Sequence, residues 1–147
     1  GRHQMRQPVI KWGTDAGGIE AATAKGMTHA RTYGNFTRLL GKYVREERVI
    51  PLEEAIRKST SAVATRLSIQ DRGLLKEGMW ADVIVFDPTT VNDRATFEKP
   101  HQLSVGISGM LVNGIEVLRD GVHTGAKPGQ VVRGPAWQFL PGGTSPR

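Results

Sequence analysis

Apolar side chains in the first half of the chain recur at the spacing of an amphipathic helix. Between residues 36 and 44 they occupy one face, and charged side chains occupy the other. The apolar members are Phe36, Leu39, Leu40, Tyr43 and Val44. Spacings of three and four positions are typical of a helix with one buried stripe. The pattern predicts a helix here, with Asn35 as its N-cap, because its short side chain can accept a hydrogen bond from a first-turn amide.

A second helix is predicted to begin at Pro51. Proline is favoured in the first helical turn, and the carboxylates of Glu53 and Glu54 suit the positive end of the helix dipole. The helix is expected to break at residues 59–61, and a short helix is expected over residues 62–67. The inward-facing positions of the second helix are Leu52, Ala55 and Ile56.

After Asp71 the pattern changes to that of strands. Residues 81–87 are rich in β-branched side chains and are followed by a proline. A continuous apolar run of this length predicts a strand that is covered on both faces. Asp82 and Asp87 are expected to end or orient this strand.

Two apolar segments between residues 107 and 118 flank the dipeptide Asn113-Gly114. Both residue types tolerate a positive φ, which a type I′ turn requires at its two central positions. The pattern therefore predicts an antiparallel hairpin. Val83 and Val85 are expected on a strand paired next to it, because β-branched residues favour sheets. Residues 141–147 are predicted to form a loose tail.

Residues 9–12 are predicted to form a brief strand that leads into a glycine-rich loop ending near residue 32. Asp15 stands at the junction. In barrels and open α/β sheets, catalytic groups collect at the carboxyl ends of strands. Asp15 is therefore a candidate general base or metal ligand, since a carboxylate can hold a divalent cation and accept a proton from water. The alternative is an aspartate that only forms a turn.

Arg31 and His29 follow in the same predicted loop. A guanidinium presents a planar fork of donors that suits a carboxylate, and a neutral imidazole can both donate and accept near physiological pH. The two residues are candidates for substrate binding; the alternative is that both bond nearby backbone carbonyls. His3, His101 and His123 lack the close spacing of metal ligands and are expected to be structural or at the surface.

Composition narrows the class of protein. The chain has 147 residues, 38% hydrophobic and 23% charged, as in one ordinary globular domain or two very small ones. The absence of cysteine excludes disulfides, thiolate metal sites and cysteine nucleophiles within it. No uncharged apolar run approaches the ~20 residues of a membrane span, and residues 1–6 do not begin a signal peptide, so a cytoplasmic protein without a membrane partner is expected. The glycine motifs that bind nucleotide phosphates are missing, so the sequence does not predict a nucleotide-binding protein.

The net charge of +6 lies wholly in residues 1–72. There the basic side chains are interspersed with acidic ones, most clearly in residues 45–58, which include Lys58. Such a mixture is typical of a solvated helix face. No interleaving of basic and aromatic residues accompanies the charge, so binding to nucleic acid is disfavoured.

The chain resembles, over most of its length, the carboxyl-terminal portion of the N-acyl-D-amino-acid deacylases, also called D-aminoacylases. The pattern within residues 71–87 is shared with many metal-dependent amidohydrolases and indicates only the superfamily. The motifs between residues 15 and 43 narrow the resemblance to the deacylases. The motifs are GTDA at 13–16, HARTYG at 29–34, FTRLLGKYVREE at 36–47, LEEAIRK at 52–58, VNG at 112–114, DGVHTG at 120–125 and DRGLLKEGMWADVIVFD at 71–87.

The resemblance implies an α+β chain that contributes to two structural units. In the family, a (β/α)₈ barrel is joined to a small β-sandwich formed by both ends of the chain. Residues 1–70 would be the carboxyl-terminal part of the barrel, with its last strand, an active-site loop and closing helices. Residues 71–135 would be strands of the sandwich, and residues 136–147 a tail rich in glycine and proline.

The resemblance also implies a reaction, the hydrolysis of the amide bond of N-acyl-D-amino acids by a zinc-activated water. By resemblance, Asp15 contacts the zinc and accepts the proton of the attacking water. Arg31 holds the carboxylate of the substrate, and His29 is its neighbour. Ala30 stands where the family usually has proline, which predicts a less rigid loop.

The family's metal-binding histidines and bridging cysteine have no counterpart in the sequence. We therefore interpret the chain as a fragment or truncated copy, and expect it by itself to bind zinc weakly and to lack deacylase activity. The alternative function is a noncatalytic module that self-associates, or binds another protein, through apolar surface left uncovered by the missing barrel. Stable dimers that bury Phe36, Leu40 and Tyr43 would favour this alternative.

Overall fold

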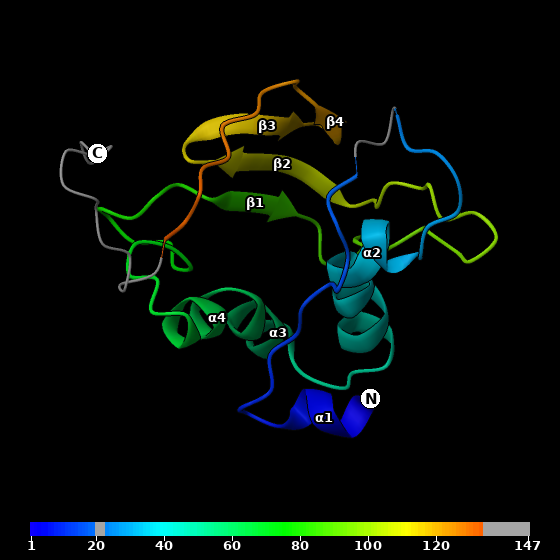
Figure 1. Cartoon of the computed structure of the whole chain (residues 1–147). Helices are drawn as coiled ribbons and strands as arrows, with labels where there is room; N and C mark the ends of the chain where they lie inside the picture. Colours follow the sequence, from blue (N-terminus) through cyan, green and yellow to red (C-terminus); the bar gives the residue numbers. More distant parts are fainter. Residues whose placement is uncertain (20–22, 134–147) are drawn as a thin grey trace.

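The computed structural model describes residues 1–19 and 23–133, with helices in the first half and one antiparallel sheet in the second (Figure 1). The predicted tail at residues 141–147 lies outside the described residues. The helices are α1 (Arg2–Arg6), α2 (Arg31–Arg38), the π-helix η1 (Leu39–Glu46), α3 (Leu52–Ser59) and α4 (Ser61–Arg66). The strands are β1 (Val83–Phe86), β2 (Ile107–Val112), β3 (Ile115–Arg119) and β4 (Val122–His123).

The helix predicted over residues 36–44 is confirmed, but its predicted start is wrong. Helix α2 begins at Arg31, with Ala30 at the N-cap position, and continues without interruption into η1. Asn35 lies inside the helix, where its side-chain amide donates to the carbonyl of Gly13 at 3.1 Å. The Asn35 side chain therefore bonds a distant segment and does not cap the helix.

The helices predicted after Pro51 are confirmed to within a residue at each boundary. Helix α3 follows Pro51, and Ala55 is fully buried on its inner side. A small core lies between η1, α3 and the N-terminal segment; its buried members are Leu39, Val49, Ile50 and Ala55, and the partly buried residues around them are Met5, Trp12, Leu40, Tyr43 and Val44. Among the described residues, no helix has the length and apolarity needed to cross a membrane.

The strands form one sheet in the order β1-β2-β3-β4, and every neighbouring pair is antiparallel. The predicted hairpin is confirmed, and Asn113 and Gly114 have φ values of 51° and 79° at its turn. The expected neighbouring strand is also confirmed, since Val83 lies opposite Leu111 and Val85 opposite Gly109.

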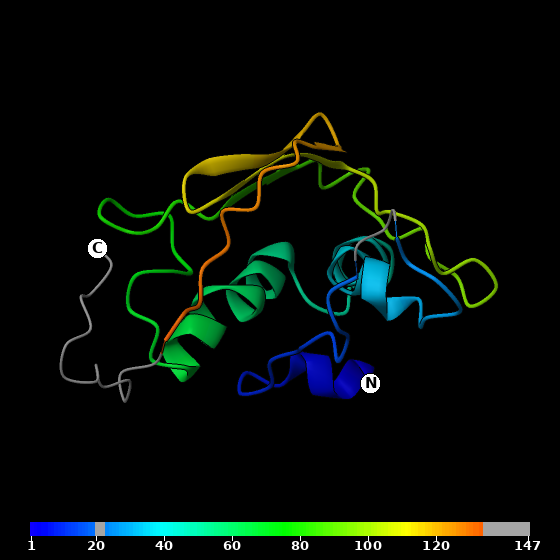
Figure 2. The ribbon, with the colours of Figure 1, turned by 45° about the horizontal axis from the view of Figure 1, so that its top comes forward.

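The prediction that the first strand is covered on both faces is wrong. Ile84 and Val85 are adjacent and point to opposite faces, yet their exposed fractions are 55% and 53%. Strand β1 is the edge of the sheet, and Figure 2 shows the sheet as one layer lying above the helices. The described residues therefore supply too little apolar surface to cover both faces of β1.

Asp82 and Asp87 orient the ends of β1, as predicted. The Asp82 carboxylate accepts a hydrogen bond from the backbone N–H of Asn113 at 2.8 Å. The hydroxyl and the backbone N–H of Thr89, together with the hydroxyl of Thr90, donate to the Asp87 carboxylate and lower its pKa.

The brief strand predicted over residues 9–12 is wrong. Residues 10–19 have no regular secondary structure. A strand needs a neighbour to pair its backbone groups, and the part of the chain described here places none beside this segment. The segment is instead held by side chains of the helices, including the amide of Asn35.

Replacing Asn113 tests the hairpin turn. The Asn113 amide donates to the carbonyl of Pro128 at 2.7 Å and its oxygen accepts from Arg72 at 2.6 Å. Asn113→Ala should lower the free energy of unfolding by about 2 kcal/mol, because alanine disfavours the positive φ and both side-chain bonds are lost. Asn113→Gly relieves the backbone and should cost only about 1 kcal/mol. Urea denaturation measures both, and an equal loss in the two variants would contradict a role for the backbone conformation.

Candidate functional site

The structure brings Asp15 and Arg31 together. Arg31 is the first residue of α2, and Asp15 lies in the preceding loop with a positive φ of 49°. The guanidinium Nη1 is 3.2 Å from the carboxylate Oδ2, and the exposed fractions of the two side chains are 41% and 86%. Because an exposed ion pair contributes little to stability, both groups remain open to exchange for another charged partner.

His29 supports the backbone that carries Arg31. Its Nδ1 accepts a hydrogen bond from the backbone N–H of Arg31 at 3.0 Å, so this nitrogen carries no proton in the observed contact. The imidazole packs edge-on against the ring of Phe97, with the centroids 5.0 Å apart. His29 therefore lies beside Arg31, and its described bond is to a backbone amide rather than to a carbonyl. Its role in substrate binding stays a prediction.

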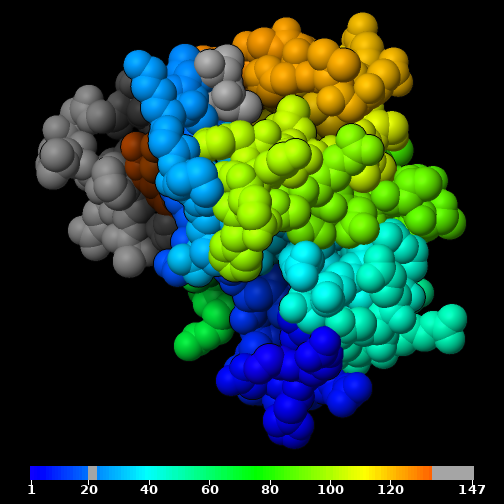
Figure 3. Space-filling view, turned by 90° about the vertical axis from the view of Figure 1, so that its right-hand side faces the viewer, coloured from blue at the N-terminus to red at the C-terminus, as the bar shows by residue number. Residues whose placement is uncertain are grey.

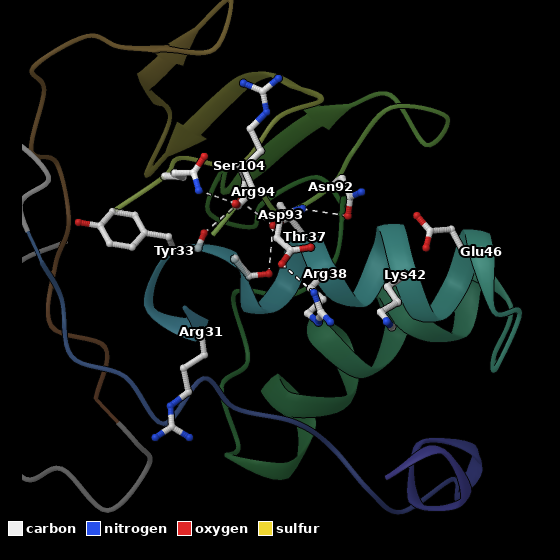
Figure 4. A network of polar contacts seen from close by, with 12 residues as sticks. Arg31, Tyr33, Thr37, Arg38, Lys42, Glu46, Asn92, Asp93, Arg94 and Ser104 are labelled. Carbon is white, nitrogen blue, oxygen red and sulfur yellow. Dashed lines mark hydrogen bonds and ion pairs between the residues drawn. The ribbon is translucent and has the colours of Figure 1, made fainter. Parts of the chain in front are cut away.

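Helix α2 is anchored to residues 92–104 by polar contacts (Figure 4). The hydroxyls of Thr37 and Ser104 are 2.6 Å apart, and Ser104 donates to the carbonyl of Tyr33 at 3.0 Å. Gly34 allows this close approach, since a Cβ built on it would lie 2.5 Å from the Cβ of Asp93. Figure 4 shows Arg31 at the start of α2, pointing away from this network. The anchored helix therefore presents the guanidinium outward.

Arg38 and Asp93 form a second ion pair on α2. Arg38 Nη1 lies 3.0 Å from Asp93 Oδ2, and the Asp93 side chain is only 10% exposed. Partial burial disfavours the charge of Arg38, but the hydrogen bond and the charge of Asp93, together with Tyr43, outweigh it and raise the pKa of Arg38 above its usual value. This pair holds the segment after β1 against the same helix that carries Arg31.

A cavity of about 600 Å³ adjoins the site. Its wall is formed by α2, the N-terminal segment and residues 93–98; lining residues include Met5, Trp12, Arg31, Arg38 and Phe97. Figure 3 shows the loop before α2 lying against the segment that follows β1. His101 joins the same two segments, with Nε2 2.7 Å from the carbonyl of Gly26 and Nδ1 3.0 Å from the hydroxyl of Tyr33. His101 is thus structural, as predicted.

The described residues do not fit a complete zinc site. Within residues 1–19 and 23–133, no group of three or more histidine, cysteine, aspartate or glutamate side chains is placed to hold a metal ion. A catalytic zinc takes about three protein ligands. Arg31 is paired with the carboxylate of Asp15, so the observed partner of this carboxylate is a guanidinium.

Residues 7–118 match the model of the amidohydrolase family. The chain belongs to the amidohydrolase family. It is 48% identical over 105 residues to the N-acyl-D-aspartate deacylase of Alcaligenes xylosoxydans xylosoxydans, a match that covers 71% of this chain and 21% of the relative. Its sequence resemblance to the N-acyl-D-amino-acid deacylases is therefore confirmed.

Solved structures of this amidohydrolase family agree with the assignment. The N-acyl-D-glutamate deacylase of Bordetella bronchiseptica, in complex with zinc and a phosphonate inhibitor, is 54% identical, with a TM-score of 0.60 over 60% of this chain and 19% of that one. D-aminoacylase is 43% identical, with a TM-score of 0.65 over 67% of this chain and 21% of that one. This member of the family thus spans about a fifth of the length of the relatives it matches.

Sequence interpretation missed one residue of the site's framework. Lys58 was assigned to a solvated face, but it is fully buried, and its ammonium donates to the carbonyls of Met5 and Gln7 at 2.6 Å each. Its position three residues after the buried Ala55 was the available signal, because residues at i and i+3 share a helix face.

Proposed function

We propose that this chain is the carboxyl-terminal part of a zinc-dependent amidohydrolase that hydrolyses the amide bond of N-acyl-D-amino acids. The observation that carries the proposal is the juxtaposition of Asp15 and Arg31, a carboxylate and a guanidinium 3.2 Å apart, of which Arg31 lines a cavity. The matched relatives act on N-acyl-D-aspartate and N-acyl-D-glutamate, which carry both a carboxylate and an amide. We propose that the chain by itself is inactive.

In the proposed active site, Arg31 binds the α-carboxylate of the substrate through its planar fork of donors. His29 lies beside it and also lines the cavity. The scissile carbonyl of an N-acyl amino acid is only a few bonds from the α-carboxylate. A substrate held by Arg31 would therefore place this carbonyl near Asp15, after its carboxylate had replaced that of Asp15 on the guanidinium.

The proposed role of Asp15 is proton transfer. As water adds its oxygen to the carbonyl carbon, the Asp15 carboxylate accepts the proton that the water loses. The same proton passes to the amide nitrogen as the C–N bond breaks, so that the products are a free D-amino acid and a carboxylic acid, which then ionises in water. Asp15 is also the one site residue of this chain that we propose as a zinc ligand; the remaining ligands would come from outside the described residues.

Our proposal for the fold follows the same relatives. Residues 1–70, which contain all the described helices, would close a (β/α)₈ barrel and carry its active-site loop. Residues 71–135, which contain the described strands, would belong to a small β-sandwich, and residues 136–147 to a tail. The exposed apolar side chains of β1 are consistent with a further layer in the complete enzyme.

The proposal is tested by a fusion enzyme. In it, the part of the B. bronchiseptica N-acyl-D-glutamate deacylase that precedes the matched segment is followed by this chain; the 54% identity makes the graft conservative. With zinc present, we expect the fusion enzyme to hydrolyse N-acyl-D-amino acids and the chain alone to show no turnover. Turnover by the chain alone, or a folded, zinc-loaded fusion enzyme without turnover, would contradict the proposal.

The apolar surface of the sheet favours a second candidate function, a noncatalytic module derived from an amidohydrolase. Ile84, Val85, Ile115 and Val122 are all exposed. Burying such side chains against a second copy would be favourable, because apolar area leaves water. Sedimentation of the chain distinguishes the two functions: a stable dimer would favour the module, and a monomer would disfavour it.

A further inference from the structure

Lys58 is the most deeply buried charged side chain of the described residues. Its exposed fraction is 0%, and its ammonium donates to the carbonyls of Met5 and Gln7 at 2.6 Å each. Glu54 lies 3.7 Å away, and the ring of Trp12 has its centroid at 5.4 Å. A buried ammonium is costly unless it is paired and hydrogen-bonded, so this arrangement leaves little freedom to the groups around it.

The two carbonyls belong to the end of α1 and the residue that follows it. The last carbonyls of a helix have no partner within the helix, and Lys58 supplies one from α3. Figure 2 shows α1 lying below α3, the helix from which Lys58 extends. Lys58 therefore fixes the start of the segment that leads to Asp15.

The residue after Lys58 fixes the other end of the same segment. Ser59 accepts a hydrogen bond from the indole N–H of Trp12 at 2.8 Å, and donates to the carbonyl of Ala55 at 2.8 Å. Trp12 stands three positions before Asp15 in the sequence. The last turn of α3 thus holds the N-terminal segment at both ends of residues 5–12, which have no sheet partner to hold them.

We propose that Lys58 and Ser59 are positioning residues for Asp15. They hold the segment that leads to Asp15 against α3, while α2 carries Arg31. The distance between the Asp15 carboxylate and the Arg31 guanidinium therefore depends on how α2 and α3 are anchored. The inference rests on the proposed function for its kinetic consequence only; the anchoring of residues 5–12 stands on the contacts of this chain. Neither Lys58 nor Ser59 lines the cavity beside Arg31.

The anchoring is tested on the full 147-residue chain by limited trypsin digestion with mass spectrometry. Lys58→Met keeps the length of the side chain but removes the ammonium that donates to the carbonyls of Met5 and Gln7, and leaves the Gln7 carbonyl with the backbone N–H of Ile10 as its donor. We expect cleavage after Arg6 and Lys11 to accelerate roughly tenfold, because a lost buried contact raises the population of the open segment. Arg57→Met is the matched control: Arg57 is exposed and bonds Glu54, so its loss should leave both cleavage rates unchanged.

Ser59→Ala provides a second test if Lys58→Met fails to fold, because it leaves Lys58 in place and removes only the hydroxyl that accepts from Trp12 and donates to the Ala55 carbonyl of its own helix. It should accelerate cleavage after Lys11 about threefold and leave cleavage within α4 unchanged. An unchanged rate after Lys11 in this variant would overturn the anchoring.

The effect of this positioning on catalysis is tested in the fusion enzyme. A displaced base slows the chemical step without weakening the hold of Arg31 on the carboxylate, so Lys58→Met should lower kcat by about 10- to 100-fold with KM within about twofold of the parent. Arg57→Met should change neither constant. A Lys58→Met enzyme with parental kcat would overturn positioning while leaving the proposed function intact, whereas an inactive parent fusion enzyme would count against the proposed function and not against the anchoring.

Discussion

Replacing Asp15 with asparagine is expected to lower kcat of the fusion enzyme by about 10²-fold or more and to leave KM within a few fold. The amide has nearly the shape of the carboxylate but cannot accept the proton of the attacking water. Proton transfer stabilises the transition state and not the bound substrate, so the loss falls on kcat. Steady-state kinetics on an N-acyl-D-amino acid measures it.

Two controls make the Asp15 result specific. The zinc content of the Asp15→Asn enzyme separates a lost base from a lost metal, because a proton acceptor can be removed without emptying the metal centre. Asp71→Asn is the matched substitution, since Asp71 is exposed and its carboxylate accepts a hydrogen bond from the indole N–H of Trp80. An Asp15→Asn enzyme with the parental kcat would show that Asp15 is not the proton acceptor.

Replacing Arg31 with alanine is expected to act mainly on KM. Substrate and transition state share the same α-carboxylate, so losing its partner weakens both, at a cost of roughly 2–5 kcal/mol for a desolvated charge pair. Arg31→Lys should restore only part of the loss, because an ammonium cannot make the two-pronged contact. Arg38→Ala is a useful comparison, since Arg38 is on the same helix but is paired with Asp93.

The carboxamide analogue of the substrate identifies the group that Arg31 recognises. The parent fusion enzyme should strongly prefer the carboxylate substrate over its carboxamide, and Arg31→Ala should lose most of that preference. If the variant discriminated between the two substrates as strongly as the parent, Arg31 would not be the carboxylate partner.

The parts of the fold that sequence could predict are those determined by neighbouring residues. The hairpin depends on the tolerance of Asn113 and Gly114 for positive φ, and the structure gives both residues that conformation. Helix α3 depends on Pro51 and on acidic residues in the first turn, which are again local. Such features need no knowledge of what packs against them.

The structural predictions were wrong where contacts with residues distant in the sequence determine the conformation. Asn35 is a good N-cap by type, but its amide bonds Gly13 instead. Residues 9–12 have a strand-like pattern, but none of the residues that the structure describes pairs with them as a strand. The charge pattern predicts that Lys58 is solvated, but it is buried and donates to carbonyls more than fifty residues earlier in the sequence. These contacts depend on how α1, α2 and α3 meet, which the residue pattern alone does not contain.

The candidate site divides in the same way. The residue types of Asp15, Arg31 and His29 were sufficient to select them as candidates for proton transfer, metal binding and substrate binding. Their assignment to amide hydrolysis came only from the resemblance to the deacylases. Their 3.2 Å ion pair and the support of α2 by Asp93 and Ser104 required the structure. The framework of the site is therefore spread over residues that no local motif connects.

The most direct test is a crystal structure of the fusion enzyme with zinc and a phosphonate mimic of the tetrahedral intermediate of N-acyl-D-glutamate hydrolysis. Our account predicts that the Arg31 guanidinium leaves Asp15 and bonds the α-carboxylate of the inhibitor, while the Asp15 carboxylate lies within hydrogen-bonding distance of a phosphonate oxygen. An inhibitor whose carboxylate is held elsewhere, with Asp15 and Arg31 still paired to each other, would contradict it.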